Sequence, residues 1–214
     1  MNLPESQIVL LGAGPHARML AAFLTHMGHT IRGCIAPAPE PESGLDWLGP
    51  DEKLSTLLGP GDLVINGIGS VAAINARRRA FEAAVAAGAR FMDFRHPSAI
   101  SHADAEFGVA AQVFAGAIVQ PGCRIGSNVL LNTGAIIEHN VQIGDHCHVA
   151  PGACLGGGVI VGEAVHVGAG AVVLQGLNLG SRSVIGAGAV VLEDVPPDCT
   201  VVGNPARRTE KRPH

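Results

Sequence analysis

The chain is poor in charge, has no long apolar run and has no paired cysteines, and each scarcity excludes a class of protein. Charged residues make up 15% of the 214 residues and the net charge is −4, so neither nucleic acid nor a membrane surface is expected as a partner. No stretch approaches about 18 consecutive apolar residues, and residues 1–5 do not resemble the start of a signal peptide. The five cysteines form no CxxC pair, which argues against a zinc ribbon or a disulfide framework. The expected location is cytoplasmic.

What the chain has instead is a six-residue period that runs unbroken over residues 107–196. Each of fifteen successive hexads begins with a large apolar residue, and the fifth residue of nearly every hexad is small or β-branched. Strands alternate with period two and helices with period 3.6, so neither explains this pattern. The period predicts a β-helix. The first positions are Phe107, Val113, Val119, Ile125, Leu131, Ile137, Ile143, Val149, Leu155, Val161, Val167, Val173, Leu179, Ile185 and Val191.

In such a β-helix each hexad is one short strand and a corner, three hexads close a triangular coil, and residues 18 apart stack. First-position side chains fill the interior, and glycines at many second positions supply freedom where a side chain would crowd the bend. The fifteen hexads therefore make five coils, about 24 Å long at about 4.8 Å per layer. A low-complexity segment would not keep every hexad in phase. Hexapeptide repeats of this kind resemble the left-handed parallel β-helix, and its handedness comes from that resemblance.

The residues before the repeats predict a small α/β domain. Strands are expected at 8–11, 30–36, 62–68 and 90–94, with helices at 17–27 and 76–87 that Gly28 and Gly88 end. Strands that alternate with helices indicate a parallel sheet. The proline-rich segment 37–50 is left as a loop. The expected domains are 1–97 (α/β), 98–196 (β-helix) and 197–214 (C-terminal extension), and the incomplete hexad 101–106 is expected to be frayed or to act as a cap.

A Gly12-x-Gly14-x-x-Ala17 string follows the first strand. Glycines there let the backbone approach a phosphate at a helix N-terminus. The acidic residue that would hold a ribose hydroxyl after the second strand is missing, since the chain reads Ala36-Pro37 there. A nucleotide-linked ligand is therefore favoured, while a tight strand-to-helix turn without ligand and a redox nicotinamide cofactor remain alternatives.

His139 is the candidate catalytic residue of the repeats. It is third in its hexad, so its side chain points away from the core, and Gly157 of a glycine triplet stacks on it 18 residues later. A neutral imidazole can accept a proton, and an uncovered backbone N–H can hold a developing oxyanion. This pair predicts acyl transfer, whereas an ordinary surface histidine is the alternative.

Four segments resemble the NeuD/PglD-like bacterial sugar acetyltransferases, over nearly the whole chain: 96–99 (HPSA), 132–139 (NTGAIIEH), 143–149 (IGDHCHV) and 202–207 (VGNPAR). The resemblance implies a Rossmann-like α/β domain that binds a sugar nucleotide, followed by a left-handed parallel β-helix. It also implies a homotrimer with acetyl-CoA between neighbouring subunits, and a histidine as general base. Carried onto this chain, it assigns His139, Asn140 and Gly157 to catalysis, His148, Gly157, Asn204 and Pro205 to acetyl-CoA, and Gly12, Gly14, His16 and Asn132 to the substrate.

The chain departs from this family at three places. Asn140 stands where the family often has a carboxylate after the catalytic histidine, so either the base is weaker or another carboxylate assists. Ala36-Pro37 replaces acidic residues, which affects recognition of the base or ribose. His166 stands where relatives often carry an apolar or aromatic residue.

The resulting hypothesis is an acetyl-CoA-dependent enzyme that N-acetylates a nucleotide-activated amino sugar, with no metal. Three alternatives stay open. An O-acetyltransferase of a free, sialic-acid-like sugar would use the same base. A metalloenzyme similar to the γ-carbonic anhydrases would need ligands among His139, His146, His148 and His166. A noncatalytic subunit of a sugar-biosynthesis enzyme would need only the binding surfaces.

Overall fold

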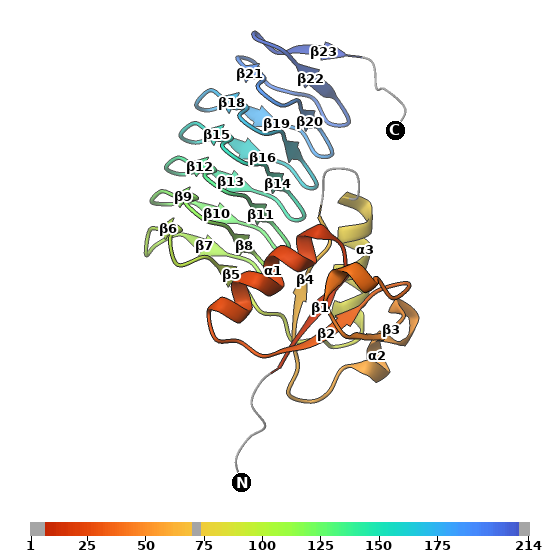
Figure 1. The fold of residues 1–214 in the computed structure, drawn as a ribbon. Helices are drawn as coiled ribbons and strands as arrows, with labels where there is room; N and C mark the ends of the chain where they lie inside the picture. The colour runs from red at the N-terminus through yellow and green to blue at the C-terminus, as the bar shows by residue number, and fades with distance from the viewer. Residues whose placement is uncertain (1–6, 70–73, 210–214) are drawn as a thin grey trace. The chain divides into compact units, whose positions relative to one another are not determined.

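The structure, a computed structural model, describes residues 7–69 and 74–209. The expectation about residues 1–5 and the last five residues of the predicted extension lie outside these ranges. The chain divides into two compact units, Met1–Asp93 and Phe94–His214, each shown in Figure 1. Within the described ranges, no helix is both long and apolar enough to cross a membrane.

The first unit is a four-stranded parallel sheet with helices, in the strand order β3-β2-β1-β4. The strands are β1 (Ile8–Leu11), β2 (Ile31–Ile35), β3 (Trp47–Gly49) and β4 (Leu63–Asn66). The helices are α1 (Pro15–His26), α2 (Leu54–Leu57) and α3 (Ile74–Ala86), with short 3₁₀ turns η1 (Pro41–Ser43) and η2 (Asp51–Lys53). All four residues of β1 are buried, as expected of a parallel strand covered on both faces.

The helix ends follow from local sequence. Helix α1 begins two residues before the expected start, at Pro15, because proline lacks an N–H and fits the first turn of a helix. Gly28 follows the helix with a φ of 85° and donates its N–H to Thr25, which closes the helix as expected. Gly88, with a φ of 73°, ends α3 in the same way.

Two expectations for this unit need correction. The strand expected at 90–94 is shared between the units, since Phe91 forms an isolated bridge to Val64 of β4 while Phe94 belongs to a strand of the second unit. The loop expected at 37–50 contains η1 and the edge strand β3. Strand β3 has no alternating apolar pattern, so pairing with β2 rather than local sequence forms it.

The second unit is a parallel β-helix of two-residue strands arranged in three sheets, and it fits the left-handed form. One sheet contains β7 (Glu106–Phe107), β10 (Arg124–Ile125), β13 (Gln142–Ile143), β16 (Ile160–Val161) and β19 (Asn178–Leu179). The second contains β6 (Ile100–Ser101), β9 (Ile118–Val119), β12 (Ile136–Ile137), β15 (Cys154–Leu155), β18 (Val172–Val173) and β21 (Val190–Val191). The third contains β5 (Phe94–Arg95), β8 (Gln112–Val113), β11 (Leu130–Leu131), β14 (His148–Val149), β17 (His166–Val167), β20 (Val184–Ile185) and β22 (Thr200–Val202), with β23 (Arg207–Thr209) antiparallel at its end.

The predicted 18-residue stacking is confirmed by the pairing of Ile137 with Leu155 and of Val149 with Val167. The core consists of first-position and fifth-position side chains. The first coil starts earlier than expected, at β5, because the hexad at 101–106 is paired in register through β6 rather than frayed. Strands β5, β6 and β7 are each the last strand of their sheet, so this coil forms the end of the solenoid.

The left-handed backbone conformation lies at the fourth position of every hexad except the last, where Asp194 lacks it. This corrects the role expected for the second-position glycines. Asn128, Asn140 and His146 have φ values between 55° and 62° at fourth positions, and glycine occupies most of the others. Second-position glycines do not have this positive φ. They are required by close approach instead, since a Cβ on Gly126 would lie 2.7 Å from the backbone nitrogen of Asp145.

Candidate active site

The third position of a hexad, except where it is proline (Pro121 and Pro151), carries a backbone N–H that the hydrogen bonds between coils do not use. At two of these positions a side chain one coil later supplies the acceptor: Asp145 accepts from the Ser127 N–H at 2.7 Å, and the Ser181 hydroxyl accepts from the Glu163 N–H at 3.2 Å. His139 and Gly157 are consecutive members of one such third-position column, so the same geometry applies to them.

The imidazole of His139 lies directly over Gly157. A Cβ built on Gly157 would be 2.6 Å from Nε2 and 2.7 Å from Cε1 of His139, which is closer than two such atoms can approach. Gly157 does not have a positive φ, so glycine is needed here for the space of the ring and not for the backbone. His139 itself is exposed, which leaves the ring accessible to a ligand.

The Gly157 N–H has no hydrogen-bond acceptor among the residues that the structure describes. The Gly157 carbonyl accepts the Gly176 N–H, and the neighbouring Gly158 N–H donates to the backbone carbonyl of His139, both at 2.9 Å. Gln175 occupies the place of the capping side chain one coil later and makes no such bond. An uncovered donor therefore lies beside the candidate base, as the stacking predicts.

Asn140 holds the other side of the His139 ring. Its Nδ2 lies 3.2 Å from Nδ1 of His139, and its φ is 59°, a conformation that asparagine tolerates better than most residues. In this orientation Nδ1 accepts and Nε2 carries the proton of the neutral ring. Rotation of the amide by 180° would place Oδ1 at Nδ1 and leave Nε2 unprotonated. No carboxylate contacts the His139 ring in the described part of the chain.

Asn132 and His148 form a second polar group on the β-helix. The Asn132 Oδ1 accepts the Thr133 N–H at 2.8 Å, which fixes its amide, and its Nδ2 lies 3.2 Å from Nε2 of His148. His148 therefore accepts at Nε2 and keeps its proton on Nδ1. The His166 ring contacts His148 edge-on with centroids 5.0 Å apart, and burial lowers the pKa of His166.

The histidines do not converge as metal ligands would. His146 is buried and its Nδ1 lies 3.0 Å from the Asn128 amide, and His148 is bonded to Asn132. Across residues 7–69 and 74–209, no group of three or more His, Cys, Asp and Glu side chains is placed to hold a metal ion.

The predicted phosphate-binding residues follow β1 in the first unit. Gly12 has a φ of 86° and donates its N–H to Ile35 at 2.7 Å. Gly14 precedes α1 with no side-chain cap, and no atom lies within 4 Å of a Cβ built on it. The first turn of α1, which includes His16, has no acidic residue, so this helix N-terminus is open and suited to an anion.

Two predicted residues lie at the end of the chain. Asn204 and Pro205 are exposed, are joined by a cis peptide bond and form the turn between β22 and β23. The structure thus brings together His139, Asn140 and Gly157 as one group and Asn132 and His148 as another.

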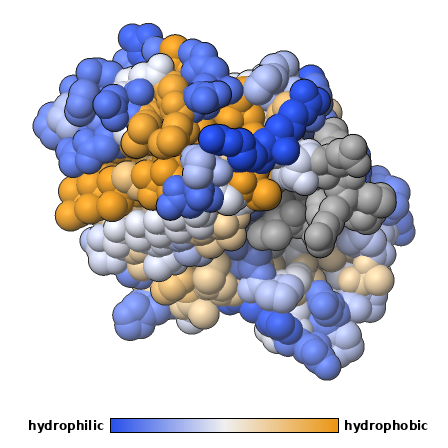
Figure 2. All heavy atoms as spheres, turned by 90° about the horizontal axis from the view of Figure 1, so that it is seen from above, coloured by the Kyte–Doolittle hydropathy of each residue, from blue (hydrophilic) through white to orange (hydrophobic). Residues whose placement is uncertain are grey.

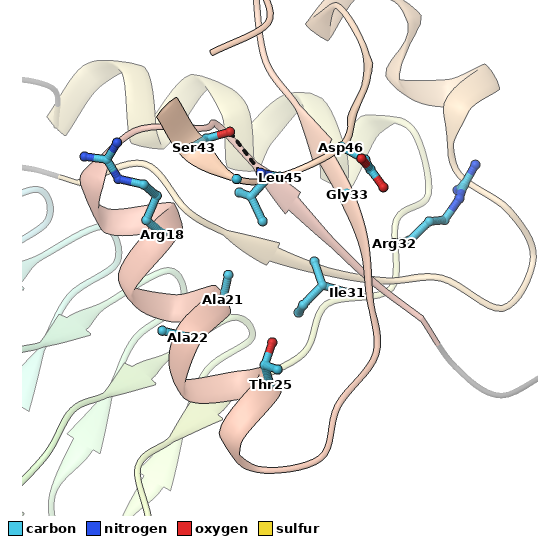
Figure 3. A pocket seen from close by; sticks show the side chains of 11 residues that line it. Arg18, Ala21, Ala22, Thr25, Ile31, Arg32, Gly33, Ser43, Leu45 and Asp46 are labelled. Atoms are coloured by element: carbon cyan, nitrogen blue, oxygen red, sulfur yellow. Dashed lines mark hydrogen bonds between the residues drawn. The ribbon is translucent and has the colours of Figure 1, made fainter. Parts of the chain in front are cut away.

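Sequence reasoning missed a cavity of about 430 Å³ in the first unit. Figure 3 shows that α1 forms one side of it and the segment 43–46 lies across from the helix. Arg18 is one of the residues that line it, and it donates to the Glu42 carbonyl at 3.1 Å. The volume is in the range of small-molecule sites. No pattern in the segment 37–50 could have revealed it, because that segment takes its shape from packing against β2 and α1.

The comparisons with known proteins agree with this architecture. The bacterial transferase hexapeptide family (six repeats) matches residues 122–157. A search of curated protein sequences gave no match. The chain is similar to PerB from Caulobacter crescentus, whose structure contains CoA and GDP-perosamine, with 30% identity, a TM-score of 0.88, and coverage of 98% of this chain and 100% of that one.

Two further structures are similar over nearly the whole chain. A histidine-to-alanine variant of GDP-perosamine N-acetyltransferase from the same organism, in complex with CoA and GDP-perosamine, is 29% identical with a TM-score of 0.89, covering 99% of this chain and 100% of that one. The acetyltransferase domain of PglB from Neisseria gonorrhoeae, in complex with acetyl-CoA, is 29% identical with a TM-score of 0.85, covering 96% of this chain and 100% of that one.

Proposed function

Because the chain belongs to the bacterial hexapeptide-repeat sugar acetyltransferases, we propose that it transfers an acetyl group from acetyl-CoA to the amine of a nucleotide-activated amino sugar. The observation that carries the proposal is the His139 imidazole packed over Gly157, whose N–H is uncovered. The similarity to an enzyme whose structures contain CoA and GDP-perosamine supports both the donor and the class of acceptor.

In the proposed reaction, His139 accepts a proton from the sugar amine as its nitrogen attacks the thioester carbonyl. The carbonyl oxygen becomes an oxyanion, which the Gly157 N–H stabilises by a hydrogen bond. The tetrahedral intermediate then collapses, the carbon–sulfur bond breaks, and the proton leaves with CoA as its thiol. The products are the N-acetylated sugar nucleotide and CoA. Base catalysis through Nε2 requires the proton on Nδ1, so Asn140 must present its Oδ1 to the ring.

The other predicted residues take roles around this step. His148, which Asn132 holds in one tautomer, contacts acetyl-CoA. Asn204 and Pro205, which lie near the end of the chain, contact acetyl-CoA as well. Asn132 thereby acts on the donor side through His148 as well as on the substrate side. These assignments rest on the family resemblance together with the hydrogen bonds described above.

The first unit is proposed to be a Rossmann-like domain that binds the nucleotide. Open parallel sheets bind ligands at the carboxyl ends of their strands, which is where Gly12, Gly14 and His16 lie. Binding energy from this remote part of the substrate can then be used to position the reacting amine.

The β-helix is proposed to form a homotrimer through its six-stranded sheet. The outward residues of that sheet are all apolar, and they form a ladder of Ile100, Ile118, Ile136, Cys154, Val172 and Val190. Ile100 is 63% exposed, and exposed apolar area is visible in Figure 2. Burying such area is worth about 25 cal/mol per Å². The outward hexad positions of the sequence suggest Ile118, Leu130, Ile136 and Ile160 for such an interface. Leu130 is already buried and Ile160 belongs to the five-stranded sheet, so only Ile118 and Ile136 are part of this ladder.

The test is an assay of CoA release by the purified full-length protein with acetyl-CoA and a panel of GDP-, UDP- and dTDP-linked amino sugars. Turnover with at least one panel member, and an N-acetylated product, is expected. Acetylation of the hydroxyl of a free sialic acid instead would favour the O-acetyltransferase alternative. Binding of the sugar nucleotides without any turnover would indicate a noncatalytic subunit.

A further inference from the structure

Arg77 is a fully buried cation, and no residue in 7–69 or 74–209 gives it an anionic partner. Its side chain is 1% exposed, and only Nη1 is bonded, to the carbonyls of Asn66 at 3.1 Å and Ile68 at 2.8 Å. Among the residues that the structure describes, Nε and Nη2 have no hydrogen-bond partner and no carboxylate forms an ion pair with the guanidinium. Burial lowers the pKa of Arg77 to about 9, so it still carries its charge at pH 7.

The position of Arg77 in α3 adds to this imbalance. It is the fourth residue of the helix, whose first turn has no acidic residue. A cation is unfavourable at a helix N-terminus because the backbone N–H groups there already carry partial positive charge. A buried, unpaired cation at this end of a helix is costly unless an anion binds near it.

The contacts of Arg77 lead to the candidate phosphate-binding turn. The Asn66 side chain donates an Nδ2 N–H to the Arg77 carbonyl at 2.9 Å, and its Oδ1 accepts the Ile68 N–H at 3.2 Å. Hydrogen bonds with Asn66 and Arg77 therefore fix the conformation of the segment 66–69. The Ile68 side chain lies 2.8 Å from a Cβ built on Gly12, and a Cβ on Gly67 would lie 2.7 Å from the Ala17 side chain. Segment 66–69 therefore forms the support on which the turn 12–17 rests.

The topology places the charge at the edge of the sheet where ligands bind. Strands β1 and β4 are parallel neighbours with Leu11 beside Asn66, so their carboxyl ends lie together. The N-terminus of α1 follows one strand and α3 follows the other. Both helices lack acidic residues in their first turns, so no carboxylate there offsets the partial positive charge of the helix N-termini or the charge of Arg77.

We infer that Arg77 is a positioning residue of the nucleotide site: it fixes segment 66–69 against the Gly12 turn and supplies positive charge that favours the diphosphate of the sugar nucleotide. This inference rests on the proposed function for the identity of the ligand. It does not require acetyl transfer, because the anion-binding property belongs to the first unit alone.

The experiment compares the full-length protein with Arg77→Gln, Arg77→Lys and the control Arg79→Gln, which removes a charge from an exposed residue of the same helix. Binding of inorganic pyrophosphate and of GDP is measured by calorimetry. Arg77→Gln is expected to weaken both by about tenfold or more, which corresponds to about 1.4 kcal/mol. Arg77→Lys is expected to retain most of the affinity because it keeps the charge, and Arg79→Gln to stay within about twofold of wild type.

If the protein turns over a sugar nucleotide, Arg77→Gln should raise its KM by a similar factor and leave the KM for acetyl-CoA within about twofold. If Arg77→Gln does not fold, Asn66→Ala replaces it, because this variant releases Ile68 while keeping the charge and should also weaken pyrophosphate binding. A folded Arg77→Gln or Asn66→Ala protein with wild-type affinity would overturn the inference, as would wild-type protein that binds neither probe. Absence of turnover with intact, Arg77-dependent pyrophosphate binding would instead contradict only the proposed function.

Discussion

Replacing Gly157 by alanine tests the geometry of the candidate site because the nearest atoms to the added methyl group all belong to the His139 ring. The new Cβ would lie 2.6 Å from His139 Nε2, whereas ordinary contact begins near 3.4 Å. The ring must therefore move by about 0.8 Å. His139 is exposed and can rotate, and the backbone at Gly157 accepts alanine without strain. The fold should thus be almost unaffected, with a change in unfolding free energy below about 1 kcal/mol.

The effect on catalysis should be much larger. Misplacing a catalytic group by about 1 Å can reduce the rate about 10²-fold, which is about 2.7 kcal/mol of transition-state stabilisation. The Gly157 N–H remains in the alanine variant, so the loss should come from the displaced imidazole alone. We expect kcat to fall by about 10²-fold, while the melting temperature and the KM for acetyl-CoA stay near wild type.

A double-mutant cycle gives the decisive measurement. In a protein that already carries His139→Ala, the substitution Gly157→Ala should have almost no further effect on kcat, because no ring remains to be displaced. Gly152→Ala serves as a control, since Gly152 has open space around it and a φ of 67°; it should lower stability modestly and leave kcat unchanged. Additive effects of the two substitutions in the cycle, or a fully active Gly157→Ala enzyme, would refute the reasoning.

The remaining predictions address the base, its orientation, the substrate site and the assembly. His139→Ala should lower turnover by about 10²- to 10⁴-fold with CoA binding retained, and a loss below about threefold would remove His139 from the mechanism. Asn140→Asp should preserve or raise kcat in the same assay, whereas an inactive but folded variant would contradict the orienting role. Gly14→Val should fold, since the space around its Cβ is open, and should raise the KM for the sugar nucleotide but not for acetyl-CoA. Ile136→Asp should dissociate the trimer in sedimentation experiments, and a wild-type protein that sediments as a monomer at micromolar concentration would count against the assembly.

The sequence predicted the solenoid and its central contact because both follow from one period. A repeat of six residues with three strands per coil stacks residue 139 on residue 157, and the structure confirms that contact. The left-handed fourth positions could also have been found, since glycine or asparagine occupies most of them. The contact of Asn132 with His148 could not, because it joins residues 16 apart and depends on side-chain direction rather than on stacking.

The first unit was less predictable for the same reason. Strand β1 and the helix ends have local signals, namely an apolar run, a proline and two glycines. Strand β3, the cavity beside α1 and the burial of Arg77 depend on contacts between segments far apart in the chain. Arg77 lies in the sequence Arg77-Arg78-Arg79, and nothing in that run distinguishes the buried arginine from its neighbours until α3 is packed on β4.

Asn140 shows how the solenoid separates a backbone requirement from a chemical one. Asn140, at the fourth position of its hexad, has a φ of 59°, a conformation that glycine, asparagine and aspartate all accept. The backbone therefore does not decide between Asn140 and the carboxylate common in the family. An amide can turn either way toward Nδ1 of His139 and so permits both tautomers, whereas a carboxylate can only accept and would fix the proton on Nδ1. The substitution Asn140→Asp thus fixes one of the two tautomers and adds a negative charge at the base with little change in backbone strain, and its effect on kcat reports on those two properties.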